Sequence, residues 1–468
     1  MINKNRFTAK LPATVFFFIL IGCVSLFGQQ KTLVCFSDLH FDPLSNASLV
    51  DTLNKSPFDK WEVIFNNLDS TGLSKYGNDS NYRLFDSFLS GLKSADPDPG
   101  FIIYGGDFLA HNFLERFRYI TKDTSRNASD EFISKTFGFI AAKISRMFPN
   151  THVYFTLGNN DSFTGDYNAV WNGNFFKDTA PVLFDNFIFD NSQRIKFLSF
   201  YSASGSYSVS ISTKQKLISL NTNFLSAKCP PDQSVNGEKV LSWLENELES
   251  ARKNNEKVWL INHIPPGVDV YTTTAHHDPA KPLKTAVLFM TKKYNDKLIS
   301  IIEKYSDVIT ACFSGHIHTE DFRVYKSEED NSPVGFTHIV PSISPIFQNN
   351  PAFQIFKYDE QNFSLLDYDT YYLDLSVSIP EWKFEYSFDK TYGYKSLDKN
   401  TFNGLADKLQ SDEAARNNYI SYYYSQSKKA SIIKYINAYL CGISSLTDST
   451  YVVNYNKQIE SCKTEKKK

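Results

Sequence analysis

The sequence predicts an α/β protein in which two stacked β-sheets carry helices on their outer faces. Five short apolar runs lack polar alternation, which is typical of strands buried on both faces; they lie at 32–36, 101–104, 153–157, 258–261 and 308–313. Between these runs, apolar residues recur at intervals of three or four, which predicts helices within 133–144, 241–251 and 298–305. Alternating strands and helices are the pattern of an α/β sheet.

A second group of segments predicts the other sheet. Residues 207–211 alternate apolar side chains with Ser, and a Lys-Gln-Lys turn separates them from the run LISLN. Further strands are predicted at 334–340 and 352–358, and the residues DEQN at 359–362 predict a hairpin turn. We expect this second sheet to pack on the first, with the helices outside, in the order α-β-β-α.

Two changes of composition divide the chain of 468 residues. Residues 1–28 combine basic residues with a short apolar stretch, which predicts a cleaved signal peptide and therefore an exported protein. An uncleaved anchor is one alternative, and residues 20–23 also fit a lipoprotein cleavage box that would leave a lipid on Cys23. Pro380 is predicted to end the strand region, and helical spacing follows it. We therefore expect a main domain over 29–375 and a C-terminal helical subdomain over 376–468.

Five short polar clusters each follow a strand-like run. They are SDLH at 37–40, GGDFLAH at 105–111, LGNND at 157–161, NH at 262–263 and GHIH at 315–318. In α/β sheets, ligands gather at the carboxyl ends of the strands, so these clusters are expected to meet in space. Five of the nine histidines lie within them, which random placement would rarely produce.

The donors in these clusters predict a centre for two divalent metal ions. Asp107 follows the tight turn at 105–106 and is the expected bridging ligand. The other expected ligands are Asp38, His40 and His318 for one ion and Asn159, His263 and His316 for the second. Two neighbouring ions of this kind clamp a phosphate and lower the pKa of a bridging water, which is phosphoesterase chemistry. Mixed imidazole and carboxylate ligands favour Zn²⁺, with Mn²⁺ or Fe as alternatives.

The five motifs, in this order, resemble those of the calcineurin-like metallophosphoesterases. The chain is also similar to one branch of that family, the acid sphingomyelinase-like phosphodiesterases, in SDLHFDPL, GDFLAHN, SLNTNF, NHIPPG, SGHIHTEDF and NNPAFQIFKYD. The resemblance implies a four-layer α-β-β-α metallophosphoesterase sandwich over 29–375. It also implies that 376–468 is the helical ending of that branch.

One position departs from the family pattern. Asn160 stands where the family usually has a His that stabilises the transition state or protonates the leaving group. An amide donates a hydrogen bond but cannot deliver a proton. His111, four residues after Asp107, matches a second catalytic His of the sphingomyelinase-like branch and is the expected acid. Asn160 and His111 are both expected to contact the substrate.

The predicted function is that of an exported phosphodiesterase acting on phosphodiester or phosphoanhydride bonds in soluble, nucleotide-type substrates. Few residues separate the expected cleavage point from Asp38, which leaves no room for the lipid-presenting domain that the sphingomyelinase itself carries. Endopolyphosphatase and sphingomyelin phosphodiesterase activities are the alternatives, and a non-catalytic surface or binding protein is the alternative of another class. The expected location is the extracellular space or the lumen of an acidic vesicle.

The net charge and its distribution along the chain indicate which classes of partner to expect. A formal charge of −2, with interspersed acidic and basic residues, gives no broad basic field, so no nucleic-acid binding is predicted. The expected partner is a small phosphoester, namely a nucleotide, a polyphosphate or a phospholipid head group. No stable membrane span is expected in the mature chain.

Two covalent features are predicted for an exported chain. Cys441 and Cys462 flank a Ser- and Thr-rich segment and are predicted to form a disulfide, whereas Cys35 and Cys312 lie in buried-strand patterns and are expected to be free thiols; Cys229 is left unassigned. A eukaryotic source would make the chain a glycoprotein, because it carries Asn-x-Ser/Thr acceptors at Asn46, Asn54, Asn78, Asn127, Asn160 and Asn362. Asn160 is discounted as an acceptor because a glycan there would block the metal centre.

Overall fold

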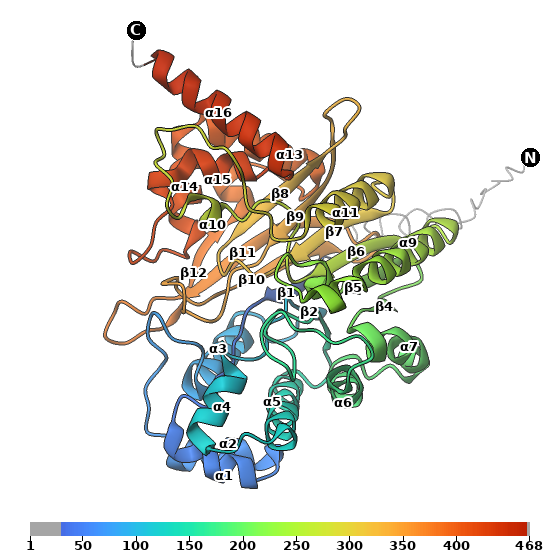
Figure 1. Ribbon diagram of the computed structural model, residues 1–468, viewed down its shortest axis with the longest axis vertical. Helices are drawn as coiled ribbons and strands as arrows, with labels where there is room; N and C mark the ends of the chain where they lie inside the picture. Colours follow the sequence, from blue (N-terminus) through green and yellow to red (C-terminus); the bar gives the residue numbers. More distant parts are fainter. Residues whose placement is uncertain (1–29, 466–468) are drawn as a thin grey trace, which may run out of the picture.

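The computed structural model describes residues 30–465, and Figure 1 shows how their helices and strands are arranged. The predicted signal peptide, the alternative anchor and the lipid site at Cys23 lie outside the described residues. No helix within residues 30–465 combines the length and the apolar character that a membrane crossing requires.

The first sheet has six strands in the order β12-β11-β10-β1-β2-β3. Its parallel half is built from the apolar runs, whose burial on both faces explains why they lack polar alternation: β1 (Gln30–Phe36), β2 (Phe101–Tyr104) and β3 (His152–Phe155). The antiparallel half begins at the other edge of β1 and consists of β10 (Ala352–Asp359), β11 (Leu365–Leu373) and β12 (Trp382–Ser387). The turn predicted at 359–362 lies between β10 and β11.

The second sheet also has six strands, in the order β4-β5-β6-β7-β9-β8. Its four inner strands run parallel: β5 (Gln215–Leu220), β6 (Lys257–Asn262), β7 (Ile309–Ser314) and β9 (Pro333–Ile339). The two edge strands, β4 (Tyr207–Ser210) and β8 (Asp321–Lys326), are antiparallel to their neighbours. Every run that the sequence predicts as a strand is therefore a strand.

The division of these strands between the two sheets differs from the expectation. The sequence groups 352–358 with 207–220 and 334–340, but β10 pairs with β1 in the first sheet. Strands β6 and β7, expected beside β1 and β2, belong to the second sheet. A hydrophobic pattern reports how deeply a strand is buried and does not identify its neighbour, so the grouping could not follow from it.

The end of the strand region is also later than expected. Strand β12 follows Pro380 and pairs with β11, although 376 onwards was predicted to be helical. Proline is compatible with the start of an edge strand because no ladder hydrogen bond is needed there. The prediction that Pro380 ends the strands is therefore wrong.

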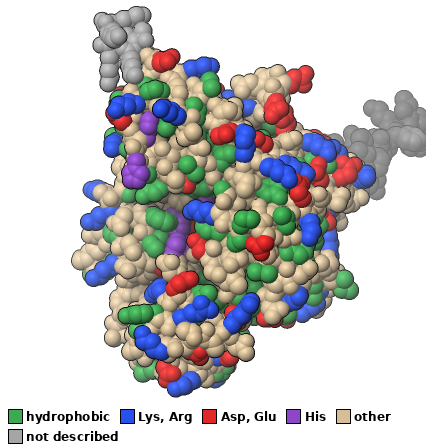
Figure 2. All heavy atoms as spheres, in the orientation of Figure 1, with side chains coloured by type: hydrophobic (Ala, Val, Ile, Leu, Met, Phe, Trp, Pro, Cys, Tyr) green, Lys and Arg blue, Asp and Glu red, His purple; other side chains and the backbone are tan. Residues whose placement is uncertain are grey.

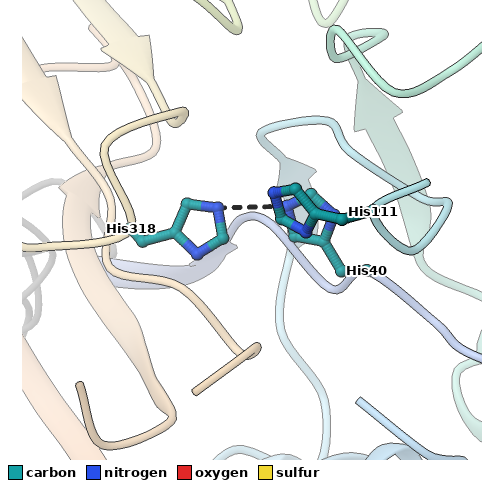
Figure 3. A group of neighbouring side chains, drawn as sticks. All are labelled: His40, His111 and His318. Atoms are coloured by element: carbon teal, nitrogen blue, oxygen red, sulfur yellow. Dashed lines mark hydrogen bonds between the residues drawn. The ribbon is translucent and has the colours of Figure 1, made fainter. Parts of the chain in front are cut away.

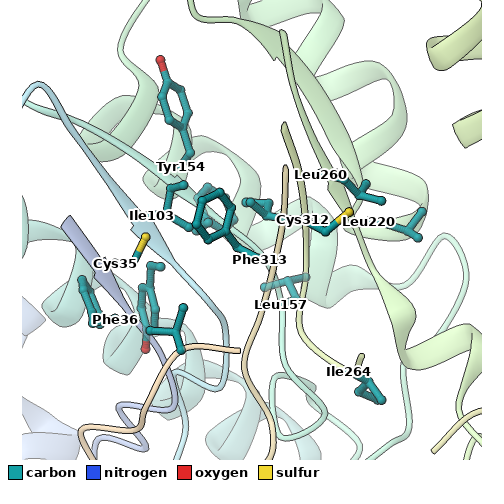
Figure 4. Packing of buried hydrophobic residues seen from close by; sticks show 14 of the residues in the cluster. Cys35, Phe36, Ile103, Tyr154, Leu157, Leu220, Leu260, Ile264, Cys312 and Phe313 are labelled. Atoms are coloured by element: carbon teal, nitrogen blue, oxygen red, sulfur yellow. The ribbon is translucent and has the colours of Figure 1, made fainter. Parts of the chain in front are cut away.

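The two sheets stack face to face through large side chains. The ring of Phe101 on β2 lies 5.6 Å from that of Trp259 on β6, and Phe313 on β7 lies 5.5 Å from Phe356 on β10. Figure 4 shows this packing, with Phe313 beside other buried residues of both sheets. The interior between the sheets is the hydrophobic core of the main domain.

Helices cover the outer faces and complete four layers. Helices α3 (Tyr82–Ala95) and α5 (Arg126–Met147) cover the first sheet, where Phe88 of α3 packs 4.9 Å from Phe36 of β1. Helix α9 (Gly237–Lys253) contacts β5 and β6, and α11 (Lys292–Lys304) contacts β8 and β9. The helical periodicity predicted within 133–144, 241–251 and 298–305 is confirmed by α5, α9 and α11.

The other elements connect these layers. The further helices before residue 300 are α1 (Val50–Lys55), α2 (Trp61–Leu68), α4 (Phe113–Thr121), α6 (Asn174–Leu183), α7 (Arg194–Ser204), α8 (Pro231–Ser234) and α10 (Val270–Thr274). Short helical turns are η1 (Ala47–Leu49), η2 (Phe58–Lys60), η3 (Phe184–Ile188), η4 (Asn191–Gln193), η5 (Thr222–Leu225) and η6 (Ile433–Tyr435).

The C-terminal helices gather at one end of the molecule, opposite helices α1 to α5 (Figure 1). They are α12 (Phe388–Tyr392), α13 (Lys399–Ser411), α14 (Glu413–Tyr423), α15 (Ile436–Gly442) and α16 (Asp448–Glu465). Asp398 caps the start of α13 and Asp412 that of α14, each accepting hydrogen bonds from two backbone amides. Helix α13 packs on β8 and β9, so the helical region is fastened to the second sheet.

The predicted disulfide between Cys441 and Cys462 is not seen. Cys441 is a buried free thiol on α15 whose Sγ contacts Ser445 Oγ at 3.6 Å and the Tyr451 carbonyl at 3.7 Å. The side chain of Cys462 lies outside the described residues. Cys35, Cys229 and Cys312 are also buried free thiols.

Candidate metal centre

The predicted ligands lie where several parallel strands end. Asp38 and His40 follow β1, Asp107 follows β2, and Asn159 follows β3 in the first sheet; His263 follows β6, and His316 and His318 follow β7 in the second. The loops are tied together by backbone hydrogen bonds, including His40 N to Asp107 O at 2.9 Å. The two sheets therefore present their carboxyl ends to one shared site.

Five of the seven predicted ligands have a left-handed backbone. The φ angles are 50° at Asp38, 44° at His40, 56° at Asp107, 77° at His316 and 62° at His318. Residues with a Cβ atom rarely adopt this region, and each such residue costs about 1–3 kcal/mol. Strain concentrated at one set of polar residues is characteristic of a functional site, because the surrounding structure must hold it in place.

Asp107 lies between histidines from both sheets. Its Oδ2 is 3.3 Å from His40 Nε2 and 3.1 Å from His263 Nε2. Its carboxylate also accepts two hydrogen bonds from Asn160, from the backbone N to Oδ1 at 2.8 Å and from Nδ2 to Oδ2 at 3.0 Å. This is the geometry expected for the bridging ligand.

His263 forms a first cluster of neighbouring donor groups with Asp38 and Asp107. Its Nδ1–H donates to the Gly105 carbonyl at 2.8 Å, which leaves the Nε2 lone pair facing Asp107. Asn159 Oδ1 lies 3.2 Å from the same Nε2, and Asn159 Nδ2 donates to Asp166 at 2.6 Å. Asp166 thus orients the amide so that its oxygen faces the cluster.

Three histidines form the second cluster, which Figure 3 shows with their rings facing one another. His40 donates Nδ1–H to the Leu109 carbonyl at 2.8 Å, so its Nε2 points at His318 Nε2, 3.1 Å away. The ring of His111 stacks on that of His40 with 4.1 Å between the centroids. His111 was predicted as an acid and not as a ligand, yet it lies within this cluster.

Asp38 connects the two clusters. The structure groups it with Asp107 and His263, but its Oδ1 is nearer to His318 Nε2, at 3.4 Å, than to His263 Nε2, at 3.9 Å. The shorter distance agrees with the predicted assignment beside His40 and His318. Its carboxylate also accepts a hydrogen bond from the His316 backbone at 3.0 Å.

His316 is the one predicted ligand that is half-buried, whereas the other six are buried. It is not part of either cluster, and its ring packs against His263, with 5.1 Å between the centroids, and against Phe289, at 5.3 Å. The structure therefore places it at the edge of the centre on the His263 side, and its role as a ligand stays a prediction.

The pKa values show a site that attracts positive charge. Burial by itself would raise the pKa of Asp107, but His263 and His40 outweigh it and hold that pKa well below its ordinary range. Burial opposes protonation of His40, but the Asp107 and Asp38 carboxylates raise its pKa to about 10. Burial lowers the pKa of His318 to about 3, so that ring keeps the neutral form that binds metals.

These donors fit a pair of divalent cations. Two buried carboxylates lie next to imidazole nitrogens whose other nitrogen is already occupied by a backbone carbonyl, an arrangement typical of metal-bound histidine. Two Nε2 atoms that face each other at 3.1 Å repel unless a proton or a cation lies with them. The donor set is therefore chemically suited to the metals that the sequence predicts.

Several supporting residues were not predicted from the sequence. Asp79 accepts hydrogen bonds from the backbone N of His111 at 2.8 Å and from its Nδ1 at 3.0 Å, and Ser344 Oγ donates to the same carboxylate at 3.0 Å. Asp161 accepts from the amides of Phe108, Leu109 and Gly158. Asp161 could have been suspected because it ends the LGNND motif, whereas Asp79 follows no strand and gave no signal.

The comparison with protein families decides the class of the protein. Residues 31–320, more than half of the chain, match the family described as calcineurin-like phosphoesterase. The chain belongs to the calcineurin-like phosphoesterases. Residues 333–461 of this phosphoesterase match a second family, described as the acid sphingomyelin phosphodiesterase C-terminal region.

Known relatives of this phosphoesterase span most of its length. A protein of Bos taurus named cyclic GMP-AMP phosphodiesterase SMPDL3A is 29% identical over 374 residues, which cover 78% of this chain and 75% of the relative. Human acid sphingomyelinase-like phosphodiesterase 3b is 25% identical and covers 82% and 81%. Sphingomyelinase phosphodiesterase D of Dictyostelium discoideum is 27% identical and covers 93% and 97%. The chain is therefore a phosphodiesterase of the acid sphingomyelinase-like family, and the predicted enzyme class is confirmed.

Gly158 offers a test of how the centre is positioned. A Cβ atom at this position would lie 2.0 Å from Asp107 Oδ1, so Gly158→Ala must displace the carboxylate. We expect kcat/KM to fall about a hundredfold, the usual cost of a misplacement of about 1 Å in an active site. The rise in melting temperature on adding Zn²⁺ should also shrink. Gly72→Ala is the matched control because nothing lies within 4 Å of its Cβ position; a Gly158→Ala protein that behaves like this control would contradict the account.

Proposed function

We propose that this protein is an exported phosphodiesterase with two divalent metal ions, acting on phosphodiester or phosphoanhydride bonds of soluble, nucleotide-type substrates. The observation that carries the proposal is the position of the Asp107 carboxylate, within 3.3 Å of an imidazole nitrogen from each cluster. A carboxylate shared in this way is the expected centre of a two-metal hydrolase.

The proposed ligands divide into two sets. Asp38, His40, Asp107 and His318 would hold one ion, and Asp107, Asn159, His263 and His316 would hold the other. Two bound ions would neutralise phosphate oxygens and supply an activated water. The mixed nitrogen and oxygen donors favour Zn²⁺, with Mn²⁺ or Fe as alternatives.

His111 is the proposed acid for the leaving group. Its side chain is 24% exposed, so it is open to solvent at the edge of an otherwise buried cluster. Because Asp79 accepts the Nδ1–H, Nε2 remains to hold a proton and pass it to a departing oxygen. Burial would raise the pKa of Asp79, but the His111 hydrogen bond and the nearby His40 lower it to about 2, which keeps this partner ionised.

The role proposed for Asn160 differs from that of the His that the family usually has at this position. Its backbone and side-chain amides both donate to Asp107. We propose that Asn160 holds the bridging carboxylate in place and donates a hydrogen bond to a bound phosphate oxygen. Proton transfer is then left to His111.

The substrate class rests on the relatives and on export. A bovine relative is named for cleavage of cyclic GMP-AMP, and relatives of Dictyostelium are named sphingomyelinases. We favour the soluble class, and we place the enzyme outside the cell or in an acidic vesicle because residues 1–28 have the pattern of a signal peptide.

Removal of the metals tests the enzyme class. We expect dialysis against a chelator to reduce hydrolysis of an aryl phosphodiester at least a hundredfold, and Zn²⁺ or Mn²⁺ to restore it, because the proposed centre has no other source of activated water. Hydrolysis that continues unchanged after chelation, with the metal content confirmed as zero, would refute the two-metal proposal. A folded, metal-loaded protein without turnover would indicate a binding protein instead.

A substrate panel tests the proposed class. Rates of hydrolysis would be compared for a cyclic dinucleotide, a nucleoside triphosphate, inorganic polyphosphate and sphingomyelin in detergent micelles. We expect the highest kcat/KM for one of the two nucleotides. A higher value for polyphosphate or sphingomyelin would replace the proposed substrate class with that one.

A further inference from the structure

Lys228 places a positive charge at the edge of the metal centre without an acidic partner. It is exposed, and none of the ion pairs among residues 30–465 includes it. Figure 2 shows His side chains within a hollow on one face of the molecule, with hydrophobic and basic side chains at its edge. An ammonium group that forms no salt bridge is available to an anionic ligand.

The loop that carries Lys228 is held in place by backbone contacts. The backbone N of Ala227 donates to the Phe289 carbonyl at 3.0 Å, and that of Lys228 donates to Ser226 Oγ at 3.1 Å. Phe289 in turn packs on the ring of His316. The backbone next to Lys228 is therefore bonded to Phe289, which packs on one of the proposed metal ligands.

The ammonium group is directed by Tyr167. Lys228 Nζ lies 4.8 Å from the centre of the Tyr167 ring and 3.4 Å from its hydroxyl. Tyr167 also donates its backbone N to the Asn159 carbonyl at 2.8 Å, and its ring lies 6.2 Å from that of His316. Lys228 is thus linked through one tyrosine to two of the proposed ligands.

The charges around Lys228 are consistent with an open anion position. Asp166 is an acidic neighbour that interacts with the charge of Lys228, but its carboxylate accepts the Asn159 amide, and none of the salt bridges among the described residues joins it to Lys228. Lys228 Nζ is held over the face of Tyr167, whose ring edge lies against the His316 ring. The ammonium group therefore lies on the His316 side of the centre, with one tyrosine ring between them.

We infer that Lys228 is a specificity-determining residue that binds a second anionic group of the substrate, such as the neighbouring phosphate of a nucleoside polyphosphate. This inference rests on the proposed phosphodiesterase function. Lysine is a common phosphate-binding residue because its ammonium offers three donors on a flexible stem.

The same contact disfavours a choline head group. Proteins bind quaternary ammonium ions over the faces of aromatic rings. Here the Tyr167 face is already covered by the Lys228 ammonium, which would also repel a second cation. One residue therefore favours substrates with adjacent phosphates and opposes phosphocholine esters.

Lys228→Met and Lys228→Glu test this inference in the full-length, metal-loaded enzyme. We would measure kcat and KM for a nucleoside triphosphate, for an aryl phosphodiester without a second charge, and for an aryl phosphocholine ester. For Lys228→Met, the ratio of kcat/KM for the triphosphate to that for the aryl diester should fall about tenfold or more, mainly through KM, because a charge-assisted hydrogen bond is lost. Lys228→Glu should lower it further and should raise the relative rate with the phosphocholine ester.

Lys122→Met provides the matched control. Lys122 also lies over a tyrosine ring, 4.1 Å from that of Tyr119, but it follows the end of α4 that is remote from His111. Its ratios should equal those of the wild type. If the wild type hydrolyses all three substrates and Lys228→Met leaves the ratios unchanged, the inference is wrong and the proposed function stands. If the metal-loaded wild type hydrolyses none of the three, the proposed function fails and this inference fails with it.

Discussion

Replacing Asp107 with Asn is expected to lower kcat/KM for an aryl phosphodiester at least about a thousandfold while the protein stays folded. Asn has nearly the same shape as Asp, but its neutral amide cannot serve as the charged oxygen between His40 and His263. Loss of that charge should remove at least one metal ion, and bound metals contribute several kcal/mol to stabilising a phosphoryl transition state. The rate and the number of bound metal ions per chain would be measured together.

The fold and the metal centre can be tested separately in this variant. Circular dichroism without metal should match that of the wild type, whereas the melting temperature without metal should be lower, because the neutral amide no longer balances the positive charge of His40 and His263. The increase in melting temperature on adding Zn²⁺ should be reduced. Asp98→Asn, at an exposed position, is the control and should change none of these quantities. An Asp107→Asn protein that binds two ions and retains its rate would show that Asp107 is not the bridging ligand.

His111→Ala is expected to slow substrates with poor leaving groups far more than substrates with good ones. An alkoxide needs a proton as it departs, whereas nitrophenolate is stable without one, and a positioned general acid contributes about 10²–10⁴-fold. We therefore expect a loss in this range for an alkyl phosphodiester and a loss of less than about tenfold for a nitrophenyl ester. Steady-state kinetics with a series of leaving groups of different pKa would give the dependence directly. Equal losses across the series would remove His111 from the acid role.

Asp79→Asn extends this test to the residue that orients His111. Its amide cannot accept the Nδ1–H with the strength of a carboxylate, so the ring should lose its fixed orientation. We expect the same leaving-group dependence as for His111→Ala, with a smaller loss and a shifted pH profile of kcat/KM. A loss that is uniform across leaving groups, with an unchanged pH profile, would mean that Asp79 only supports the fold.

Many elements of the fold could be predicted because the burial of a strand or helix is reflected in the spacing of its apolar residues. Strands such as β2 and β6 are continuous apolar runs because both their faces are covered, and α5 repeats apolar residues at helical intervals because one face is covered. The pairing of β10 with β1 could not be predicted in this way, since the hydrophobic pattern of β10 would fit either sheet.

The candidate ligands could also be named from the sequence. Each lies just after a strand, and parallel strands of stacked sheets bring such positions together whatever their separation in the chain. The supporting residues could not be named in this way. Asp79 reaches His111 from a loop 32 residues away, and Lys228 is positioned by its contact with Tyr167, which the linear order of the chain does not reveal.

By itself, therefore, the sequence predicted nine of the twelve strands among the described residues, three of the helices that cover the sheets, a set of candidate metal ligands and the family to which the chain belongs. These properties depend on residue types and on their spacing over short stretches, which can be seen directly in the sequence. The tertiary structure alone decided the membership of each sheet, the left-handed backbone at five proposed ligands, the free thiol of Cys441 and the partners of Asp107, His111 and Lys228. Those properties arise from contacts between distant segments, and packing selects one arrangement among several that the local pattern permits equally.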